Sequence, residues 1–423
     1  MKMPTTLSLA GRSLWARKYT ALLTILSIAT AVFLFLAVEN LRQGVRASFE
    51  RTISGTDLIV GARSSPVNLV LYSVFQIGDP TNNITWDTYQ EISQRPDVAW
   101  AVPISLGDTH RGYRVVGTTE QYFERYKYAG DQDIVFKTGQ PFDDLFDTVL
   151  GAQVARDLGY EMQTSLTLSH GLGGTSFVKH ENRPFEVVGI LAPTGTPVDR
   201  SVFVSLPALE AIHAGWKNGT PTPAARQMTP ELLRSLNLQP QSVTALYIGA
   251  SSRMQTLRLQ RDLNTYAAEP LQAVIPGVAL SQLWGTVSIV ERALAVVSGF
   301  VVVVGLIGVL TSILTTLNER RREMAILRSV GARGRTIIGL LVSEAALIAF
   351  IGAGLGVVLL YALLWILSPV LEARFSISTL RAWPGLTDIY VVMALTGIAA
   401  LLGLIPAGVS LKRSVSDGLS IRI

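Results

Sequence analysis

Cysteine is absent from the 423 residues, and so are the side-chain sets that most enzymes use. Without cysteine the chain cannot be a disulfide-held scaffold, and four scattered histidines make a poor metal-binding set. No G-x-x-x-x-G-K-[ST] phosphate loop, G-x-S-x-G nucleophile turn or H-E-x-x-H zinc helix occurs in the sequence. We therefore expect no catalytic residue, no metal site, no cofactor and no ATPase activity in this chain.

Charge is also scarce, at 16% of residues, and the mean hydropathy is +0.37. Soluble domains contain about 25% charged residues, so this composition is typical of a membrane protein. Four runs are long and apolar enough to cross a bilayer as helices, which takes roughly 20 residues. One run precedes a long polar segment and three follow it, a 1+3 arrangement, and Glu344 is the only charge in the four. The runs are 19–38, 293–318, 336–371 and 389–411.

Basic residues predict which ends of the spans are cytoplasmic, because short cytoplasmic loops retain Lys and Arg. They precede the first span, fill the loop between the second and third, and follow the fourth. Residues 39–292 instead hold 21 Lys and Arg against 25 Asp and Glu, a net charge of −4 in a chain of +5. We expect a multi-pass protein of a bacterial inner membrane with both termini cytoplasmic. The pI near 9.4 then reflects topology, and we expect no nucleic-acid partner.

The first run has a second interpretation, a cleaved signal peptide, because basic residues precede it and Ala29 and Ala31 resemble a cleavage pair. Its uncharged stretch is longer than a usual signal core, which favours a retained span.

The polar segment has the pattern of a mixed α/β fold. Short alternating runs such as 98–106 and 113–117 predict strands, and 85–94 and 253–266 predict helices. We expect a split α/β subdomain with a β-rich insertion, on an α-helical membrane protein of four transmembrane helices. The expected divisions are 1–38 (tail and first span), 39–285 (outer domain), 286–423 (remaining spans), with about 57–118 and 243–281 forming the split subdomain and about 119–242 the insertion.

The basic stretch 318–332 has a pattern that a simple charged anchor would not need. Met324, Leu327 and Val330 recur at helical spacing among charges, and Gly331 marks a helix end. This predicts a short amphipathic helix at the cytoplasmic surface, suited to a groove on a partner protein. The candidate docking residues are Glu319, Arg322, Glu323, Met324, Leu327, Arg328, Val330 and Gly331.

The stretch resembles the segment after the second span in the MacB/FtsX/LolC group of ABC-transporter permeases, which share the 1+3 topology and a large periplasmic domain. The resemblance continues through 340–345 (LLVSEA), the glycine-rich stretch 352–356 and the end of the fourth span at 403–407. In the outer segment, 187–191 (VVGIL) is similar to part of the family's porter and sabre subdomains.

The resemblance implies that two permease chains pair, as a homodimer or with a paralogue, and that each binds a cytoplasmic ATPase that holds ATP and Mg. Membrane lipid and a periplasmic adaptor or outer-membrane channel are the other implied partners. Residues 318–332 would pass ATPase closure to the outer domains, for export or extraction of a substrate. The alternative is an FtsX-like transducer that controls a cell-wall hydrolase without transport.

Three residues within the spans are further candidates. Glu344 lies about two turns from the cytoplasmic end, where it is either a structural partner for nearby arginines or a signalling group. Gly352 and Gly356 form a G-x-x-x-G pattern, which allows close helix packing.

The run 64–78 carries no charge over 15 residues and is too short for a fifth span. It is either a core strand and helix of the split subdomain, or an apolar surface that faces the bilayer or the dimer cleft and receives an amphipathic or lipid-linked cargo. For the second alternative the candidate residues are Leu69, Leu71, Val74 and Phe75.

Overall fold

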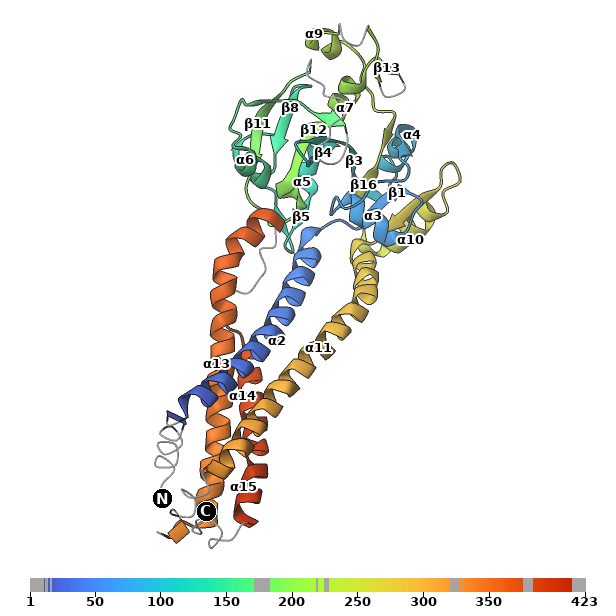
Figure 1. The fold of residues 1–423 in the computed structure, drawn as a ribbon. Helices are drawn as coiled ribbons and strands as arrows, with labels where there is room; N and C mark the ends of the chain where they lie inside the picture. The colour runs from blue at the N-terminus through green and yellow to red at the C-terminus, as the bar shows by residue number, and fades with distance from the viewer. Residues whose placement is uncertain are drawn as a thin grey trace. The chain divides into compact units, whose positions relative to one another are not determined.

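The computed structural model describes residues 11, 14–15, 17–170, 183–217, 220–223, 228–319, 326, 328–329, 331–375 and 383–412. The chain divides into two compact units (Figure 1). The helical unit comprises Met1–Gly44, Ser288–Val370 and Thr379–Ile423, and the α/β unit comprises Val45–Val287 and Leu371–Ser378.

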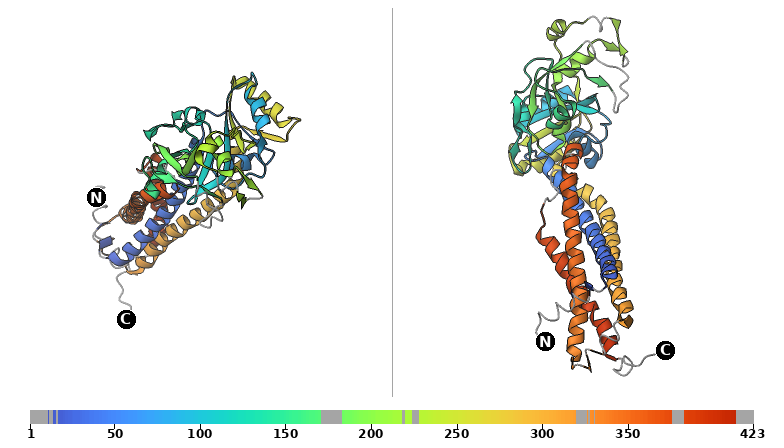
Figure 2. Two further views of the ribbon diagram at one scale, coloured as in Figure 1. Left: turned by 90° about the horizontal axis from the view of Figure 1, so that it is seen from above. Right: turned by 60° about the vertical axis from the view of Figure 1, so that its left-hand side comes forward.

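Four candidate membrane spans lie in long helices: Lys18–Thr52, Pro276–Thr315, Gly334–Ser368 and Leu386–Ser410. The prediction of a four-span α-helical membrane protein with a mixed α/β domain is therefore confirmed. Figure 2 gives two further views of these helices. They are α2 (Lys18–Thr52), α11 (Pro276–Glu319), α13 (Gly334–Phe375), α14 (Leu386–Leu402) and α15 (Leu404–Lys412).

Apolar side chains from α2, α11, α13, α14 and α15 form the core of the helical unit, among them Val32, Val309 and Leu395. Large apolar side chains such as Phe300 and Trp365 are exposed on the same helices. A helix that is apolar on every face is the form expected where lipid replaces water.

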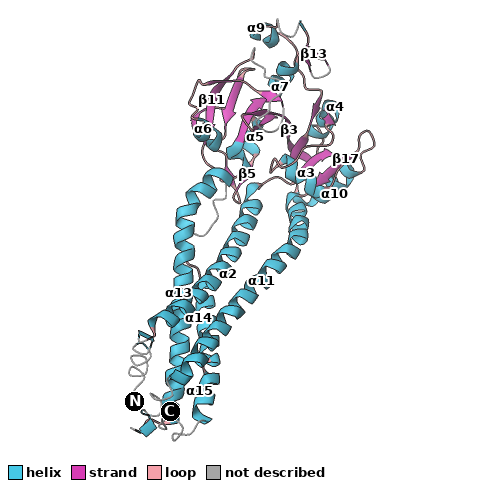
Figure 3. Cartoon of the chain, viewed as in Figure 1, coloured by secondary structure: helices cyan, strands magenta, loops and turns pink. Residues whose placement is uncertain are grey.

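The α/β unit is built on one mixed sheet, and the strands of the described residues all belong to this unit (Figure 3). Two pairs, β12–β4 and β11–β8, are parallel and the others are antiparallel. The strand order is β17 (Leu271–Val274), β1 (Leu58–Ala62), β16 (Ala245–Ala250), β3 (Val98–His110), β4 (Tyr113–Thr118), β12 (Ser201–Ser205), β8 (Asp147–Leu150), β11 (Phe185–Leu191) and β7 (Phe136–Gly139), with β10 (Ser169–His170) on β3 and β9 (Ser165–Leu166) on β11.

Strand β3 joins the two parts of this sheet. Its first half, as far as Ile104, pairs with β16, and its second half, from Ser105, pairs with β4. The strands beyond β16 come from both ends of the polar segment, whereas those beyond β4 come from its middle. This is the arrangement of a split subdomain with an insertion; the residue boundaries given above stay a prediction.

Short helices cover the sheet and follow ordinary capping rules. Helix α4 begins after Thr85, whose Oγ1 accepts a hydrogen bond from Thr88 N at 3.4 Å, as the sequence pattern predicts. The helices are α3 (Pro66–Ser73), α4 (Trp86–Ser93), α5 (Gln121–Arg125), α6 (Ala152–Leu158), η1 (Pro197–Arg200), α7 (Leu206–His213), α9 (Pro230–Arg234) and α10 (Arg253–Asn264), and the small two-stranded pairs are β2 (Ile84–Thr85) with β15 (Ser242–Val243), β5 (Lys127–Tyr128) with β6 (Gln132–Asp133), and β13 (Trp216–Lys217) with β14 (Thr220–Pro221).

Candidate functional site

Two glycines of α13 lie directly against α2. A Cβ built at Gly352 would lie 2.8 Å from Ile28 Cβ, and one at Gly356 would lie 2.7 Å from Ala29 O. Such approaches are closer than carbon atoms tolerate, so only glycine permits this helix spacing. Gly354, between the two, would meet nothing within 4 Å. The G-x-x-x-G pair therefore sets the contact between the first and third spans.

Glu344 lies on the same helix and pairs with a residue that precedes the first span. Its carboxylate is buried at 4% exposure, and Oε1 lies 3.7 Å from Arg17 Nη2. The structure thus supplies an arginine partner, which the structural alternative for Glu344 requires. A signalling role stays a prediction.

We expect Glu344→Gln to destabilise the chain, because it removes the carboxylate charge whose Oε1 lies 3.7 Å from Arg17 Nη2. Breaking a buried pair typically costs about 3–5 kcal/mol, and the partial exposure of Arg17 places this pair at the lower end. The interaction energy of the pair is measured from the free energy of unfolding in detergent. Three purified variants are compared with the native chain: Glu344→Gln, Arg17→Gln and the double variant. The double variant should lose clearly less stability than the sum of the losses in the two single variants. Strictly additive losses would show that the two groups do not interact.

The predicted coupling segment lies mostly outside the described residues. Arg322, Glu323, Met324, Leu327 and Val330 all fall there, so the structure gives no account of them.

The rest of the coupling segment is described at single positions. Glu319 is the last residue of α11, Arg328 is helical, and Gly331 has a φ of 97°, the conformation in which glycine ends a helix. The coupling role of these eight residues stays a prediction.

The two alternatives for run 64–78 are now distinguishable at several residues. Leu69 and Val74 are buried at 0% and 4% exposure, so an exposed cargo surface formed by them is wrong. The physical reason is Gly61 of β1, whose missing side chain leaves room for Leu69: a Cβ there would lie 2.5 Å from Leu69 Cδ1. Leu71 is partly buried against the same core. Phe75 is also in the core, but it lines a cavity as well.

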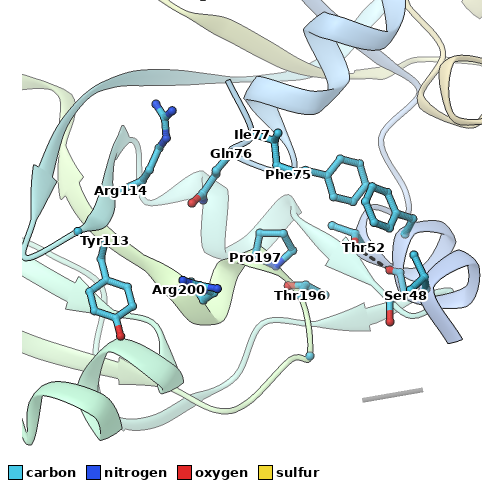
Figure 4. Close-up of a pocket in the computed structure, with 14 residues that line it drawn as sticks. Ser48, Thr52, Phe75, Gln76, Ile77, Tyr113, Arg114, Thr196, Pro197 and Arg200 are labelled. Atoms are coloured by element: carbon cyan, nitrogen blue, oxygen red, sulfur yellow. Dashed lines mark hydrogen bonds between the residues drawn. The ribbon is translucent and has the colours of Figure 1, made fainter. Parts of the chain in front are cut away.

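This cavity has a volume of about 430 Å³ and lies wholly within the α/β unit (Figure 4). Four separate segments form its walls: the last turns of α2, the residues after α3, the β3–β4 turn and the loop that enters β12. The lining residues are Val45, Ser48, Phe49, Thr52, Phe75, Gln76, Ile77, Gly112, Tyr113, Arg114, Gly195, Thr196, Pro197 and Arg200.

Local backbone geometry fixes two of these walls. Arg111 and Gly112 both have positive φ, 48° and 88°, which fits the tight two-residue turn between β3 and β4. Gln76 has a φ of 58° after α3, and its Nε2 donates a hydrogen bond to Ser201 Oγ at 2.5 Å. The residues after α3 are therefore tied to the start of β12.

A buried carboxylate holds the third wall. Asp199 accepts hydrogen bonds at 2.8 Å from Thr194 N, Thr194 Oγ1 and Gly195 N. Burial raises the pKa of Asp199, and these hydrogen bonds oppose that rise. The carboxylate thus closes the loop 194–200 on itself and presents Thr196, Pro197 and Arg200 to the cavity.

One end of the cavity is aromatic. The rings of Phe49 and Phe75 stack with centroids 4.3 Å apart, and Trp284 packs edge-on against Phe49 at 5.6 Å. Ile77, at 53% exposure, extends this apolar wall.

The other end is cationic. Arg114 Nη2 donates to Gly78 O at 2.6 Å and pairs with Asp79 Oδ1 at 2.8 Å, and Arg200 is exposed. Tyr113 lies beside them, and its hydroxyl donates to Asp157 Oδ2 at 2.8 Å. Burial, with that hydrogen bond, raises the pKa of Tyr113 to about 12. No Asp or Glu is among the lining residues, so the cavity has an apolar end and a positive end.

Sequence reasoning identified only Phe75 among these lining residues. Arg114 and Arg200 come from distant segments, and each alone is an ordinary arginine near a turn. The signal that identifies them is the parallel pairing of β4 with β12, which places Arg114 opposite Ser201. That pairing is not readable from either segment alone.

Four long apolar helices and a large α/β unit are the features of a multi-pass membrane protein with a substantial domain outside the bilayer core. The chain matches the MacB-like periplasmic core domain family over residues 21–257 and the FtsX-like permease C-terminal family over residues 295–415. It belongs to the MacB/FtsX-type family of ABC-transporter permeases.

Two curated relatives illustrate the similarity. The chain is 24% identical to the pyoverdine export ATP-binding/permease protein PvdT of Pseudomonas syringae pv. tomato, over 84% of this chain and 51% of that protein. It is also 24% identical to the macrolide export ATP-binding/permease protein MacB of Acinetobacter baylyi, over 93% of this chain and 56% of that protein. The chain thus spans about half the length of the curated relatives it matches.

Among solved structures, the periplasmic region of MacB from Actinobacillus actinomycetemcomitans matches 55% of this chain and 94% of its own, with 11% identity and a TM-score of 0.33. The extracellular domain of the transporter YknZ from Gram-positive bacteria matches 51% of this chain and 98% of its own, with 13% identity and a TM-score of 0.31.

Proposed function

We propose that this chain is the membrane subunit through which a separate cytoplasmic ATPase moves an outer domain, for export or extraction of a substrate from the periplasm or outer leaflet. ATP and Mg are held by the ATPase, and two permease chains pair. Both termini and the 318–332 segment lie in the cytoplasm, as the distribution of Lys and Arg supports.

The continuity of two helices is the observation that carries this proposal. Helix α2 belongs to the helical unit as far as Gly44 and to the α/β unit from Val45, and α11 crosses between the units at Val287 and Ser288. They run for 35 and 44 residues, whereas a span needs roughly 20. Neither helix is interrupted in sequence at the boundary, which supports the proposal that a displacement of the spans reaches the outer domain along its backbone.

Side chains tie the two helices together within the helical unit. Arg42 Nη2 lies 2.7 Å from Glu39 Oε1 on α2, and Arg42 Nη1 lies 3.5 Å from Glu291 Oε2 on α11. Arg42 therefore bridges two carboxylates at the level where the apolar runs end. This bridge favours joint movement of α2 and α11.

A helix break tests the proposal. Leu41 is half-exposed on α2, so Leu41→Pro removes a backbone hydrogen bond and kinks the helix without emptying a core position. Because the chain has no cysteine, a spin label at Val135→Cys reports the distance between the α/β units of two paired chains. We expect ATP to shift this distance in the assembled complex, and Leu41→Pro to abolish the shift.

Leu41→Ala is the matched control, because alanine keeps the helix, and it should retain the ATP-dependent shift. Absence of any ATP-dependent shift in the unmodified helix would contradict the proposed function. If Leu41→Pro retained the full ATP-dependent change in the spin-label distance, movement would not be transmitted through α2.

A further inference from the structure

The cavity of the α/β unit has the size and the asymmetry of a ligand site. Its volume of about 430 Å³ lies within the range of roughly 300–1,000 Å³ that small-molecule pockets occupy. Figure 4 shows Arg114, Arg200 and Tyr113 grouped away from Phe75, Thr52 and Ser48. The two arginines therefore lie apart from the aromatic ring of Phe75.

The cationic end retains hydrogen-bonding capacity. Arg114 is 10% exposed at its side chain, and the hydrogen bonds it makes within the described residues both use Nη2. A guanidinium carries five N–H donors, and a carboxylate, sulfonate or phosphate group accepts from two of its nitrogens at once. Asp79, the partner of Arg114, is 62% exposed and does not line the cavity.

The charges of the lining residues indicate whether a cation, a neutral molecule or an anion fits the cavity best. A cation would meet the like charges of Arg114 and Arg200, and no carboxylate is among the lining residues. A neutral apolar molecule would leave the cationic end unused. An anion with an apolar body satisfies both ends, with its body against Phe49, Phe75 and Ile77.

We propose that this cavity binds a freely diffusing amphipathic anion, with its acidic group at Arg114 and Arg200 and its apolar body against the Phe49–Phe75 stack. Ligand binding here requires neither ATP nor the ATPase. The proposal therefore goes beyond the proposed function, and its failure would leave the coupling through α2 untouched.

The cysteine-free chain allows a site-specific test. Ile77→Cys places a single thiol on the cavity wall, and Val135→Cys places one on an exposed surface outside it, at a position that is 59% exposed in the native chain. Each variant of the full chain is placed in nanodiscs of phosphatidylcholine, and its reaction rate with N-ethylmaleimide is measured. Decanoate is the anionic probe, and decanol is the matched neutral probe.

We expect decanoate to slow modification of Ile77→Cys about fivefold or more and decanol to slow it less than about twofold. A solvent-exposed ion pair has an effect of up to this order. Val135→Cys should react equally in all cases. Equal protection by both probes, or protection by neither, would overturn the proposal.

Substitution of the arginines tests whether protection by decanoate depends on the cationic end of the cavity. In the Ile77→Cys background, Arg200→Gln should reduce the decanoate protection and leave the effect of decanol unchanged. Arg200 is exposed, so this variant should fold. Arg114→Lys keeps the charge and should retain part of the protection. Decanoate protection unchanged in Arg200→Gln would contradict the placement of the acidic group.

An anionic lipid also has an acidic group and an apolar body. Changing the lipid composition of the nanodisc distinguishes a bound lipid from a freely diffusing ligand. If phosphatidylglycerol in the disc protects Ile77→Cys without decanoate, the occupant is a lipid and the proposal of a freely diffusing ligand is overturned. A thiol that reacts with no reagent in either disc would show that another chain covers the cavity, which would also overturn it.

Discussion

Gly352→Leu is expected to separate α13 from α2 and to destabilise the helical unit. The added side chain would meet Ile28 Cβ at 2.8 Å and the backbone oxygen of Ile25 at 3.0 Å, and a backbone atom cannot move aside as a side chain can. Overpacking of a well-packed interior costs typically about 1–3 kcal/mol, and the backbone contact places this site at the upper end. Thermal unfolding of the purified chain in detergent measures the loss.

Gly354→Leu is the matched control, because it makes the same substitution two residues along the same helix. Its Cβ would meet nothing within 4 Å, and its neighbourhood on α13 is apolar. We expect this variant to unfold close to the native temperature. Similar losses in the two variants would mean that the loss at Gly352 does not come from contact with α2, because leucine forms helices better than glycine does.

Leu327→Glu is expected to abolish ATP turnover that depends on the permease, while the chain still inserts in the membrane. The sequence places Leu327 on the apolar face of the predicted coupling helix. A carboxylate there would have to be buried without a partner in the groove of the ATPase, and burial of an unpaired charge costs more than loss of the leucine alone. ATP hydrolysis by the purified ATPase, with and without the permease, measures the effect.

Leu327→Met keeps the volume and the apolar character of the side chain, so it should preserve turnover. Native turnover in Leu327→Glu would remove the coupling role from this helix face. Because Leu327 lies outside the described residues, this experiment tests the sequence pattern directly.

The sequence predicted the spans well, because hydropathy over about 20 residues is a strong and local signal. It did not predict how far α2 and α11 continue. Residues after Val38 are charged and amphipathic, so hydropathy ends there, whereas the helix continues to Thr52. The glycine pair was also predictable, because a spacing of four places two residues on one helix face.

The candidate site was largely beyond sequence reasoning. The run containing Leu69 and Phe75 was identified for its lack of charge, but burial of Leu69 depends on Gly61, and that contact depends on how α3 packs on β1. The cationic end of the cavity depends on a parallel strand pair whose members are separated by a long insertion. Long-range strand pairing of this kind cannot be predicted from the residue pattern of either segment.

The place of β1 in the sheet has a consequence for biosynthesis. Both of its neighbours, β16 and β17, lie at the far end of the polar segment. At translation rates of about 5–20 residues per second, the interval between synthesis of β1 and synthesis of its partner strands is on the order of ten seconds or more. In that interval β3 and β4 pair as a local hairpin, while both edges of β1 stay open. The first strand to be synthesised is thus among the last to be covered, and it is the segment of the nascent chain most exposed to wrong pairing.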